Sequence, residues 1–548
     1  MRFAIAQINT IPSDFEGNFE KIRRAVESAR ENKADIVIFP ELSLSGYLNL
    51  DTIYTEEFIA ENNSYLKMVE RLSDGIGIII GHITARKNPI RSNRYDISSL
   101  RFGGRYSYYN SASFCFNRKT LYTYHKQKLP SFDVFNEERY FKSGIRDGIF
   151  RFRGLKIGIN ICEDIWYADG PYERQGERQV DVIVNISASP FYEGKPEIRL
   201  SMISKKVKRY RVFTIYVNAV GGQDELIYDG NSMVFDRDGH LLRLGRSFEE
   251  DIFVVDISET NKTHVSFNRD EMLFRGIICG IRDYFEKNRI ENAIIGLSGG
   301  VDSALVSTLA SIALGKERVI NVFMPSQFTS EESRRLVEDF IKRQGTRLID
   351  IPITRAFSIL KEELKDIPVS STLPYENIQS RIRGGILMFV ANSHKGAVIA
   401  TGNKNEIALG YNTLYGDTVG AIAPIGDLYK DEVISLCKYI NRNFRDIIPE
   451  GIINRVPTAE LRENQKDEDD LPPYSVTNRL LYEMIENNRS DRELIKLGFD
   501  EEIISRVHSA IKRSEFKRRQ MPPIIKLKQK SFGMGRRIPI TSYFRYMR

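Results

Sequence analysis

Short apolar runs alternate with helical segments along the first half of the chain. Apolar runs of strand length occupy residues 2–9, 34–42, 75–83, 155–164, 180–189 and 213–222. Between them lie segments such as Asn18–Glu31, in which apolar residues recur at helical spacing. Strands that alternate with helices are typical of an α/β domain with mostly buried strands, and such sheets present their chemistry at strand ends.

The pattern changes after residue 257. The segment Ser258–Asp270 is polar and aperiodic, which predicts a linker, and Glu271–Asn288 has helical spacing. A strand, a glycine-rich turn and a helix follow in NAIIGLSGGVDSALVSTLASIAL, with another strand at VINVFMP. These elements predict a second α/β domain of the doubly wound type. The expected division is therefore a domain over 1–257, a linker over 258–270 and a domain over 271–548, with an exposed acidic loop at Arg462–Asp470.

Composition narrows the class of protein. The chain has 548 residues, of which 41% are hydrophobic and 28% charged, values of a soluble globular protein. No apolar run approaches the roughly 18 residues of a membrane span, and the N-terminus lacks the pattern of a secretory signal. Four cysteines are scattered without CxxC spacing, which argues against disulfides or a zinc site. We expect a cytoplasmic protein that acts without a membrane; its net charge of +7 suits anionic small molecules.

The glycine-rich turn in the second half carries the first chemical signal. Glycines let the backbone approach an anion, and the following helix N-terminus adds aligned N–H groups. The turn is not a Walker A sequence, but SGGVDS resembles the pyrophosphate-binding loop of the ATP pyrophosphatases. The resemblance implies ATP contacts from Gly296, Leu297, Ser298, Gly299, Gly300, Val301, Asp302 and Ser303.

Longer strings in the same half resemble the NAD⁺ synthetases. They are STLPYENIQSRIRG, TGNKNEIALGYNTLYGDTVGAIAPIGDLYK, PTAELRENQKDEDDLPPY and KRRQMPP. The resemblance implies that ATP also contacts Thr401 and Lys430, and that deamido-NAD⁺ binds Asn377, Glu406 and Lys517. It further implies that Asp302 and Glu406 hold Mg²⁺. In this family ATP adenylates the nicotinate carboxylate, pyrophosphate leaves, and ammonia displaces AMP.

The first half supplies a candidate source of ammonia. Its strings FPELSLSGY, HKQKLPSFDVFNEERYF and GINICEDIW resemble the nitrilase, or carbon–nitrogen hydrolase, family. The resemblance implies an α-β-β-α sandwich and a catalytic set of Glu41 as base, Lys126 as oxyanion stabiliser and Cys162 as nucleophile. Lys126 is also expected to depress the thiol pKa. Glutamine would be bound by Ser189, Lys195, the supporting Glu137 and Phe132, which replaces the family's usual tyrosine.

Two of these assignments have rivals in the sequence. Lys128 competes for the lysine role, but Lys126 fits the Lys-x-x-Leu-Pro pattern. Cys115 competes as nucleophile, but SASFCFNRK is typical of a core strand.

Other functions share parts of these signals. A GMP synthetase would use a different amidase, and a tRNA-modifying thiolase would need more cysteines or a nucleic-acid module. A catalytically dead sensor would not need the complete catalytic set. The basic cluster Lys512–Arg519 could bind nucleic acid, but its KRRQ matches the synthetase tail, so no nucleic-acid partner is expected. Glutamine-using members are commonly large homo-oligomers, octamers among them, so the resemblance implies a homo-oligomer.

Overall fold

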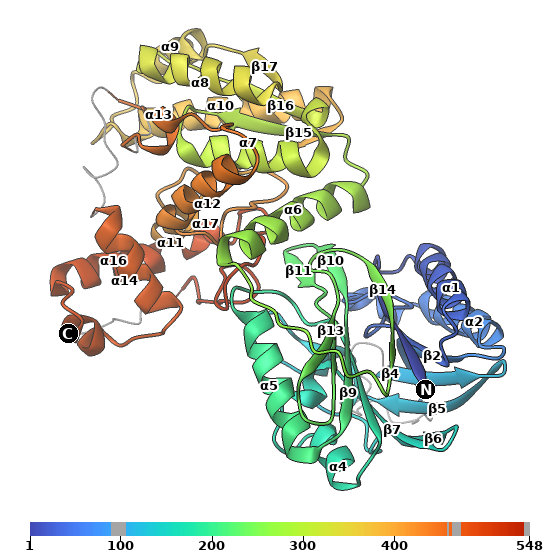
Figure 1. The fold of residues 1–548 in the computed structure, drawn as a ribbon. Coiled ribbons are helices and arrows are strands. Elements are labelled where there is room, and N and C mark those ends of the chain that lie inside the picture. Colours follow the sequence, from blue (N-terminus) through green and yellow to red (C-terminus); the bar gives the residue numbers. More distant parts are fainter. Residues whose placement is uncertain (89–105, 457–459, 463–472, 542–548) are drawn as a thin grey trace. The chain divides into compact units, whose positions relative to one another are not determined.

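The computed structural model describes residues 1–88, 106–456, 460–462 and 473–541 (Figure 1). The chain forms two compact units. The first comprises Met1–Gly221 and Ile227–Phe267, and the second comprises Gly222–Leu226 and Asn268–Arg548. Most of the acidic loop expected after Arg462 lies outside the described residues. Within the described ranges, no helix is long and apolar enough to span a membrane.

Two six-stranded sheets form the first unit. In spatial order, one sheet contains β14 (Asp251–Asp256), β1 (Arg2–Gln7), β2 (Ile36–Ile38), β3 (Gly77–Lys87), β4 (Tyr106–Phe116) and β5 (Lys119–His125). The other contains β13 (Leu241–Leu244), β12 (Met233–Phe235), β9 (Phe213–Asn218), β8 (Val182–Ser187), β7 (Leu155–Ile161) and β6 (Ile149–Phe152). The helices are α1 (Phe15–Glu31), α2 (Glu56–Leu72), α3 (Glu137–Tyr140), α4 (Pro171–Glu177) and α5 (Lys195–Tyr210), and a short hairpin pairs β10 (Val220–Gln223) with β11 (Leu226–Asp229).

The two sheets pack face to face and are covered by helices. One buried cluster joins Ile5 and Ile38 of the first sheet to Ile159 and Val184 of the second. A second cluster joins the outer face of the second sheet to α5, for example Tyr216 to Ile203. Helices α1 and α2 contact the first sheet. This arrangement is the α-β-β-α sandwich that the nitrilase resemblance implied, and it places the carboxyl ends of β7, β8 and β9 together because these strands are parallel.

A four-stranded parallel sheet organises the second unit, in the order β17 (Arg347–Asp350), β16 (Val319–Phe323), β15 (Asn292–Leu297) and β18 (Gly396–Val398). Helices α7 (Val301–Leu314) and α10 (Leu373–Ser393) both contact β15. The remaining helices are α6 (Arg269–Lys287), α8 (Glu331–Gln344), α9 (Thr354–Glu363), α11 (Lys404–Leu409), α12 (Lys430–Asn443), α13 (Glu450–Ile453), α14 (Tyr474–Ile485), α15 (Asp491–Lys496), α16 (Glu501–Arg513) and α17 (Glu515–Arg518). The doubly wound fold expected for this half is confirmed.

Side-chain caps set where the expected helices begin. The Asp14 carboxylate accepts the N–H of Gly17, so α1 starts at Phe15, three residues before the sequence pattern suggested. The Asn268 side chain accepts the N–H of Glu271, so α6 starts at Arg269 within the segment expected as linker. Periodicity therefore identified both helices, and local hydrogen bonds fixed their ends.

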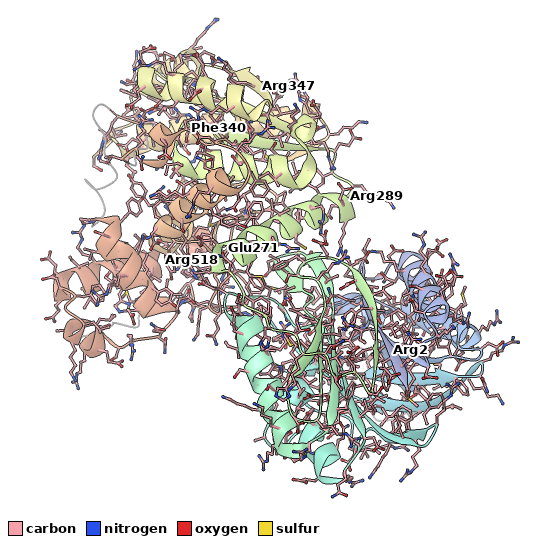
Figure 2. All side chains as sticks on the ribbon, viewed as in Figure 1. Arg2, Glu271, Arg289, Phe340, Arg347 and Arg518 are labelled. Carbon is pink, nitrogen blue, oxygen red and sulfur yellow. The ribbon has the colours of Figure 1, made fainter. Side chains whose placement is uncertain are left out.

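The basic cluster near the C-terminus is largely engaged within the fold. The Arg518 side chain, labelled in Figure 2, is buried and donates to the carbonyls of Ile407 and Ala408 (3.1 and 2.8 Å). Arg519 pairs with Glu515. These cations stabilise the helical region around α11 and α17. A role within the fold is therefore favoured over a nucleic-acid site for this cluster.

Candidate active sites

Three of the expected amidase residues come from different elements and meet in the first unit. The Lys126 ammonium donates to Oε1 of Glu41 and to Oε1 of Glu137, each at 2.7 Å. All three side chains are buried, with no more than 2% of any one exposed. Glu41 follows β2, Lys126 follows β5 and Glu137 begins α3. Glu41 and Glu137 are 96 positions apart in the sequence. The motif match thus predicted residues that are distant in the sequence and adjacent in the fold.

Cys162 lies beside this cluster at the end of β7. Its backbone is left-handed, with φ of 44°, at the sharp turn between β7 and a 3₁₀ helix over Cys162–Ile165. Burial raises the pKa of the thiol well above its usual range, Glu41 adds to the rise, and Lys126 opposes it. Lys126 therefore lowers the thiol pKa as expected, although burial and Glu41 together outweigh its effect.

The buried charges around Lys126 influence each other strongly. Burial alone would lower the pKa of Lys126, but the attraction of Glu137 and Glu41 raises it well above its usual range. Burial raises the pKa of Glu137 to about 7, against the opposing effect of Lys126. Lys126 is thus a permanent cation at this position, and the Glu137 carboxyl group changes charge near pH 7.

Further hydrogen bonds orient Glu41 and Glu137, and the sequence analysis assigned no role to any of their donors. Asn110 donates its side-chain amide to Glu41 Oε1 at 2.7 Å. The backbone N–H of Ala188 donates to Glu41 Oε2 at 2.9 Å. Tyr47, which the FPELSLSGY string contains, donates its hydroxyl to Glu137 at 2.7 Å. The carboxylate of Glu41 is therefore fixed at both oxygens, which suits a base that acts in one direction.

The expected glutamine-binding residues divide into two groups. Ser189 is 4% exposed and donates its N–H to the Asn218 side chain at 2.9 Å. Lys195, the first residue of α5, places its ammonium 3.9 Å from the ring centre of Trp166, near the nucleophile turn. Phe132, in contrast, is 53% exposed and packs its ring against Phe135. The Phe132 ring therefore lies at the surface. Because phenylalanine lacks the hydroxyl of the family's usual tyrosine, this side chain can offer glutamine only an apolar contact.

A buried ion pair supports the group that contains Ser189 and Lys195. Arg199, one turn after Lys195 on α5, pairs with Asp229 at 2.9 Å, and neither side chain is exposed. Asn218, which holds Ser189, also donates to Asp229 at 3.4 Å. The ion pair therefore connects the first turn of α5 to the loop that carries Ser189.

In the second unit, the SGGVDS loop joins β15 to α7. Gly299 has φ of 86°, and a Cβ there would lie 3.3 Å from the carbonyl oxygen of Ser333, so glycine is required. The Ser298 hydroxyl accepts the N–H of Gly300 at 3.2 Å, and the Ser303 hydroxyl accepts the N–H of Ser298 at 3.2 Å. These bonds hold the loop open at the N-terminus of α7, the geometry expected of an anion site.

Four residues expected to contact ATP, Mg²⁺ or deamido-NAD⁺ lie near Asn403, directly or through a neighbour. Lys430 forms an ion pair with Asp302, and the Asn403 side chain donates to Asp302 at 3.1 Å. The backbone N–H of Asn403 donates to Glu406 at 3.1 Å. Thr401 lies two residues before Asn403. The structure thus gathers residues from α7, α11 and α12 beside the glycine-rich loop.

Asn377 and Lys517 meet the segment that follows α11. Asn377 accepts the hydroxyl of Thr413 at 2.8 Å, and Lys517 donates to the carbonyls of Gly410 and Asn412 at 2.7 and 2.6 Å. Burial lowers the pKa of Lys517. The two residues are 140 positions apart in the sequence. Both bond to residues 410–413, which directly follow α11, the helix that carries Glu406.

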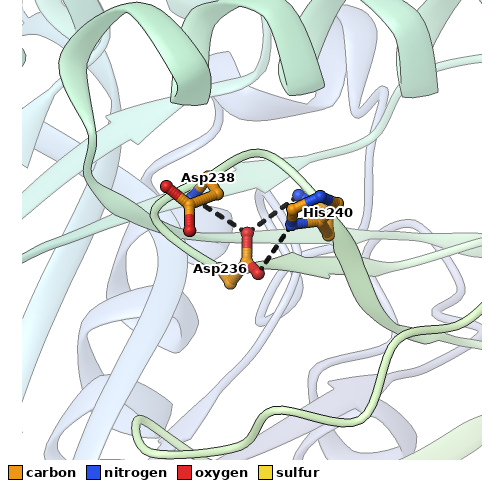
Figure 3. A group of neighbouring side chains, drawn as sticks. All are labelled: Asp236, Asp238 and His240. Carbon is orange, nitrogen blue, oxygen red and sulfur yellow. Dashed lines mark hydrogen bonds and ion pairs between the residues drawn. The ribbon is translucent and has the colours of Figure 1, made fainter.

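One other group of potential metal ligands occurs among the residues that the structure describes. The side chains of Asp236, Asp238 and His240 offer ligand atoms within 4.8 Å of one another (Figure 3). Asp236 accepts the N–H groups of Asp238 and His240 at 2.9 and 2.8 Å and approaches His240 Nδ1 at 3.0 Å. These contacts close the turn between β12 and β13, so the cluster is explained by the turn.

Comparisons with known proteins agree with both halves. Residues 2–263 match the carbon-nitrogen hydrolase family, and residues 273–522 match the NAD synthase family. A glutamine-dependent NAD(+) synthetase of Thermotoga maritima is 36% identical, over 100% of this chain and 99% of its own. One of Synechocystis sp. is 36% identical over 99% of this chain and 98% of its own.

A solved structure extends the similarity to three dimensions. The glutamine-dependent NAD⁺ synthetase of Acinetobacter baumannii in complex with ADP is 30% identical, with a TM-score of 0.77 over 100% of this chain and 99% of that one. Sequence and structure therefore correspond over the full length and in both halves. The chain belongs to the glutamine-dependent NAD(+) synthetases.

Proposed function

We infer that this chain catalyses the ATP-dependent amidation of deamido-NAD⁺ to NAD⁺ with nitrogen from glutamine, as a carbon–nitrogen ligase. The geometry that supports this best is the buried Lys126 ammonium between Glu41 and Glu137, beside Cys162. An amidase of this kind supplies ammonia, and the phosphate-loop unit supplies the activated acid. The products are NAD⁺, AMP, pyrophosphate and glutamate.

Glutamine hydrolysis begins with a neutral thiol. Because burial raises the pKa of Cys162, the proton leaves only as the sulfur attacks the amide carbon, and Glu41 accepts it. The permanent Lys126 cation stabilises the oxyanion that forms. Glu41 then returns the proton to the departing ammonia, which leaves a thioester on Cys162. Glu41 next activates a water molecule, whose attack releases glutamate and restores the thiol.

The second unit activates the acid. A carboxylate is a poor electrophile, so the nicotinate carboxylate of deamido-NAD⁺ attacks the α-phosphorus of ATP and pyrophosphate leaves. Ammonia attacks the carbonyl carbon of this adenylate, and AMP departs. The N–H groups in the first turn of α7, which begins at Val301, bind the phosphates at the end of the loop, and Lys430 offsets their charge. Asn377 and Lys517 bind deamido-NAD⁺ beside the segment that follows α11.

The donor set beside the loop fits Mg²⁺. Magnesium in ATP-dependent enzymes is usually held by one or two carboxylates together with the substrate phosphates. Asp302 accepts the side-chain amide of Asn403 and Glu406 accepts its backbone N–H, so both carboxylates lie next to this residue. These two carboxylates would hold the ion, which neutralises phosphate charge when bound.

The cysteines and the family membership bear on cellular location and assembly. All four cysteines of the chain are unpaired, as in proteins of the reducing cytoplasm, and we place the enzyme there. We also propose a homo-oligomer, as in glutamine-using members of the family. Light scattering of the purified protein measures the subunit number directly.

Purified protein supplied with ATP, Mg²⁺, deamido-NAD⁺ and glutamine labelled with ¹⁵N at the side-chain amide is expected to form NAD⁺ with the label in its carboxamide. Mass spectrometry of NAD⁺ measures the label, and equal amounts of AMP and glutamate should accompany it. Unlabelled ammonium added in excess should dilute the label, since it competes for the same adenylate. Glutamine consumption without any labelled NAD⁺ would contradict the proposed function.

Glutamine hydrolysis is expected to rise with pH through about 7, where Glu137 loses its proton. The sign follows from electrostatics, because the ionised Glu137 attracts the Lys126 ammonium and holds that cation in place for the oxyanion. Glu137→Gln should therefore lower kcat for glutamine by roughly tenfold and remove the limb near pH 7. Glutamate release measured from pH 5.5 to 9 tests this. An unchanged limb in the variant would assign it to another group.

A further inference from the structure

We propose that Asp164 is a positioning residue for glutamine hydrolysis, which holds the segment that carries Lys126 against the turn that carries Cys162. The inference rests on the proposed roles of these two residues and extends them to a group that had no assigned role. Asp164 lies two residues after Cys162, in the 3₁₀ helix that begins at the nucleophile, and its side chain is fully buried.

One carboxylate receives four hydrogen bonds. Oδ1 of Asp164 accepts the backbone N–H groups of Gln127 (3.1 Å) and Lys128 (2.8 Å). Oδ2 accepts the hydroxyl of Tyr124 (2.7 Å) and the backbone N–H of Ile161 (3.0 Å). Tyr124, Gln127 and Lys128 surround Lys126 in sequence, whereas Ile161 directly precedes Cys162. A single side chain therefore joins the two catalytic segments at four points.

Other contacts anchor each segment to its surroundings, and one further pair joins them near the surface, where the Lys128 ammonium lies 3.0 Å from Asp169. The N–H of Lys126 donates to the carbonyl of Asn110, and its carbonyl accepts the N–H of Gly144, both at 2.8 Å. On the other side, Asn185 donates to the carbonyl of Cys162 at 3.4 Å. These bonds fix each backbone to its own surroundings. Asp164 is buried, and its side chain accepts backbone N–H groups from both segments.

The four donors to the Asp164 carboxyl group are neutral groups. Burial raises the pKa of its carboxyl group, and the hydrogen bonds from Lys128, Tyr124 and Ile161 oppose that rise. None of the four donors is a cation, so this carboxylate does not serve as the partner of a salt bridge. Four short bonds to one charged acceptor instead make a rigid connection, because each costs more to break than a bond between neutral groups.

The decisive substitution is Asp164→Asn, which keeps the volume but replaces one acceptor oxygen with a donor. We expect kcat for glutamine hydrolysis to fall at least 100-fold and KM for glutamine to change less than threefold, since the binding residues are untouched. Ammonia-supported NAD⁺ synthesis should stay within twofold of wild type, which reports an intact second unit. The melting temperature checks folding of the whole chain.

Alkylation of Cys162 separates positioning from a simple charge effect, because the two predict opposite signs. Removing a nearby negative charge by itself favours the thiolate and would speed the reaction with iodoacetamide at a given pH. Displacing the Lys126 cation disfavours the thiolate and would slow it. We expect slower alkylation, with the rate profile moved to higher pH. Faster alkylation with wild-type kcat would overturn the proposal.

Two further variants sharpen the test. Tyr124→Phe removes one of the four bonds without changing charge, and we expect a three- to tenfold fall in kcat together with slower alkylation. Asp181→Asn is the matched control: Asp181 also accepts a backbone N–H, that of Lys156, but at the opposite end of β7 from Cys162. It should leave kcat unchanged. If Asp164→Asn does not fold, wild-type behaviour of Tyr124→Phe overturns the proposal by itself.

Cys162→Ala distinguishes a failure of the positioning role of Asp164 from a failure of the proposed active site. If Cys162→Ala still hydrolyses glutamine, the assignment of the nucleophile is wrong and Asp164 has no site to position. If Cys162→Ala is inactive but Asp164→Asn retains wild-type kcat and alkylation, the active site stands and the positioning role is wrong.

Discussion

Cys162→Ala is expected to abolish NAD⁺ synthesis from glutamine while ammonia still supports it at close to the wild-type rate. Removal of a catalytic nucleophile typically costs on the order of 10⁴-fold or more. Without the sulfur no thioester forms, and the remaining Glu41 and Lys126 have no acyl group to stabilise. The second unit keeps its own loop and its own substrates, so it can amidate the adenylate with free ammonia.

NAD⁺ formation measured with glutamine and with ammonium chloride, side by side, tests this division of labour. Cys115→Ala is the matched control, because Cys115 is also buried in the first unit but lies in β4 beside Thr120. Burial raises its pKa to about 11, and we expect full activity from both nitrogen sources. Loss of the ammonia-supported reaction in folded Cys162→Ala would show that the two chemistries do not reside in separate sites.

Asp302→Ala is expected to give the opposite pattern. NAD⁺ synthesis should fall by roughly 10²–10³-fold with either nitrogen source, a typical cost of losing one electrostatic group at a reacting centre. The substitution removes a carboxylate proposed to hold Mg²⁺ and also removes the ion pair between Asp302 and Lys430. Basal glutamine hydrolysis should persist, because the amidase residues lie in the other unit.

Glutamate release and pyrophosphate release, measured separately, distinguish the two effects. Asp431→Ala serves as control, since this exposed carboxylate lies next to Lys430 on α12 and carries the same charge. It should leave both reactions unchanged. Retention of pyrophosphate release in Asp302→Ala would remove Asp302 from the ATP site.

Periodicity predicted the elements of this fold better than their ends. The apolar run over residues 34–42 forms a strand only at Ile36–Ile38. The chain then turns, because Pro40 has no N–H to donate and Leu42 adopts a left-handed φ of 47°. That turn is what presents Glu41 to Lys126. The apolar pattern over residues 34–42 does not predict such a turn, whereas the motif FPELSLSGY identifies Glu41 as a functional residue.

The catalytic residues were predictable from motifs, and their supporting residues were not. Glu41, Lys126 and Cys162 stand in strings that resemble a known family. Asn110 supports Glu41 only because β4 pairs with β3 in one register, which places it opposite Ile83. Asp164 is visible in the string GINICEDIW, but its four partners become apparent only when two distant segments are adjacent. Pairing register and tertiary contact are not local properties of a sequence.

The left-handed backbone at Cys162 restricts which nucleophile evolution or design can install there. A φ of 44° is tolerated by unbranched side chains at modest cost, but it crowds a side chain that is branched at Cβ. Serine could therefore occupy the turn without rebuilding it, although its hydroxyl would need a stronger base. Threonine could not, so a threonine hydrolase cannot arise on this scaffold by a single codon change.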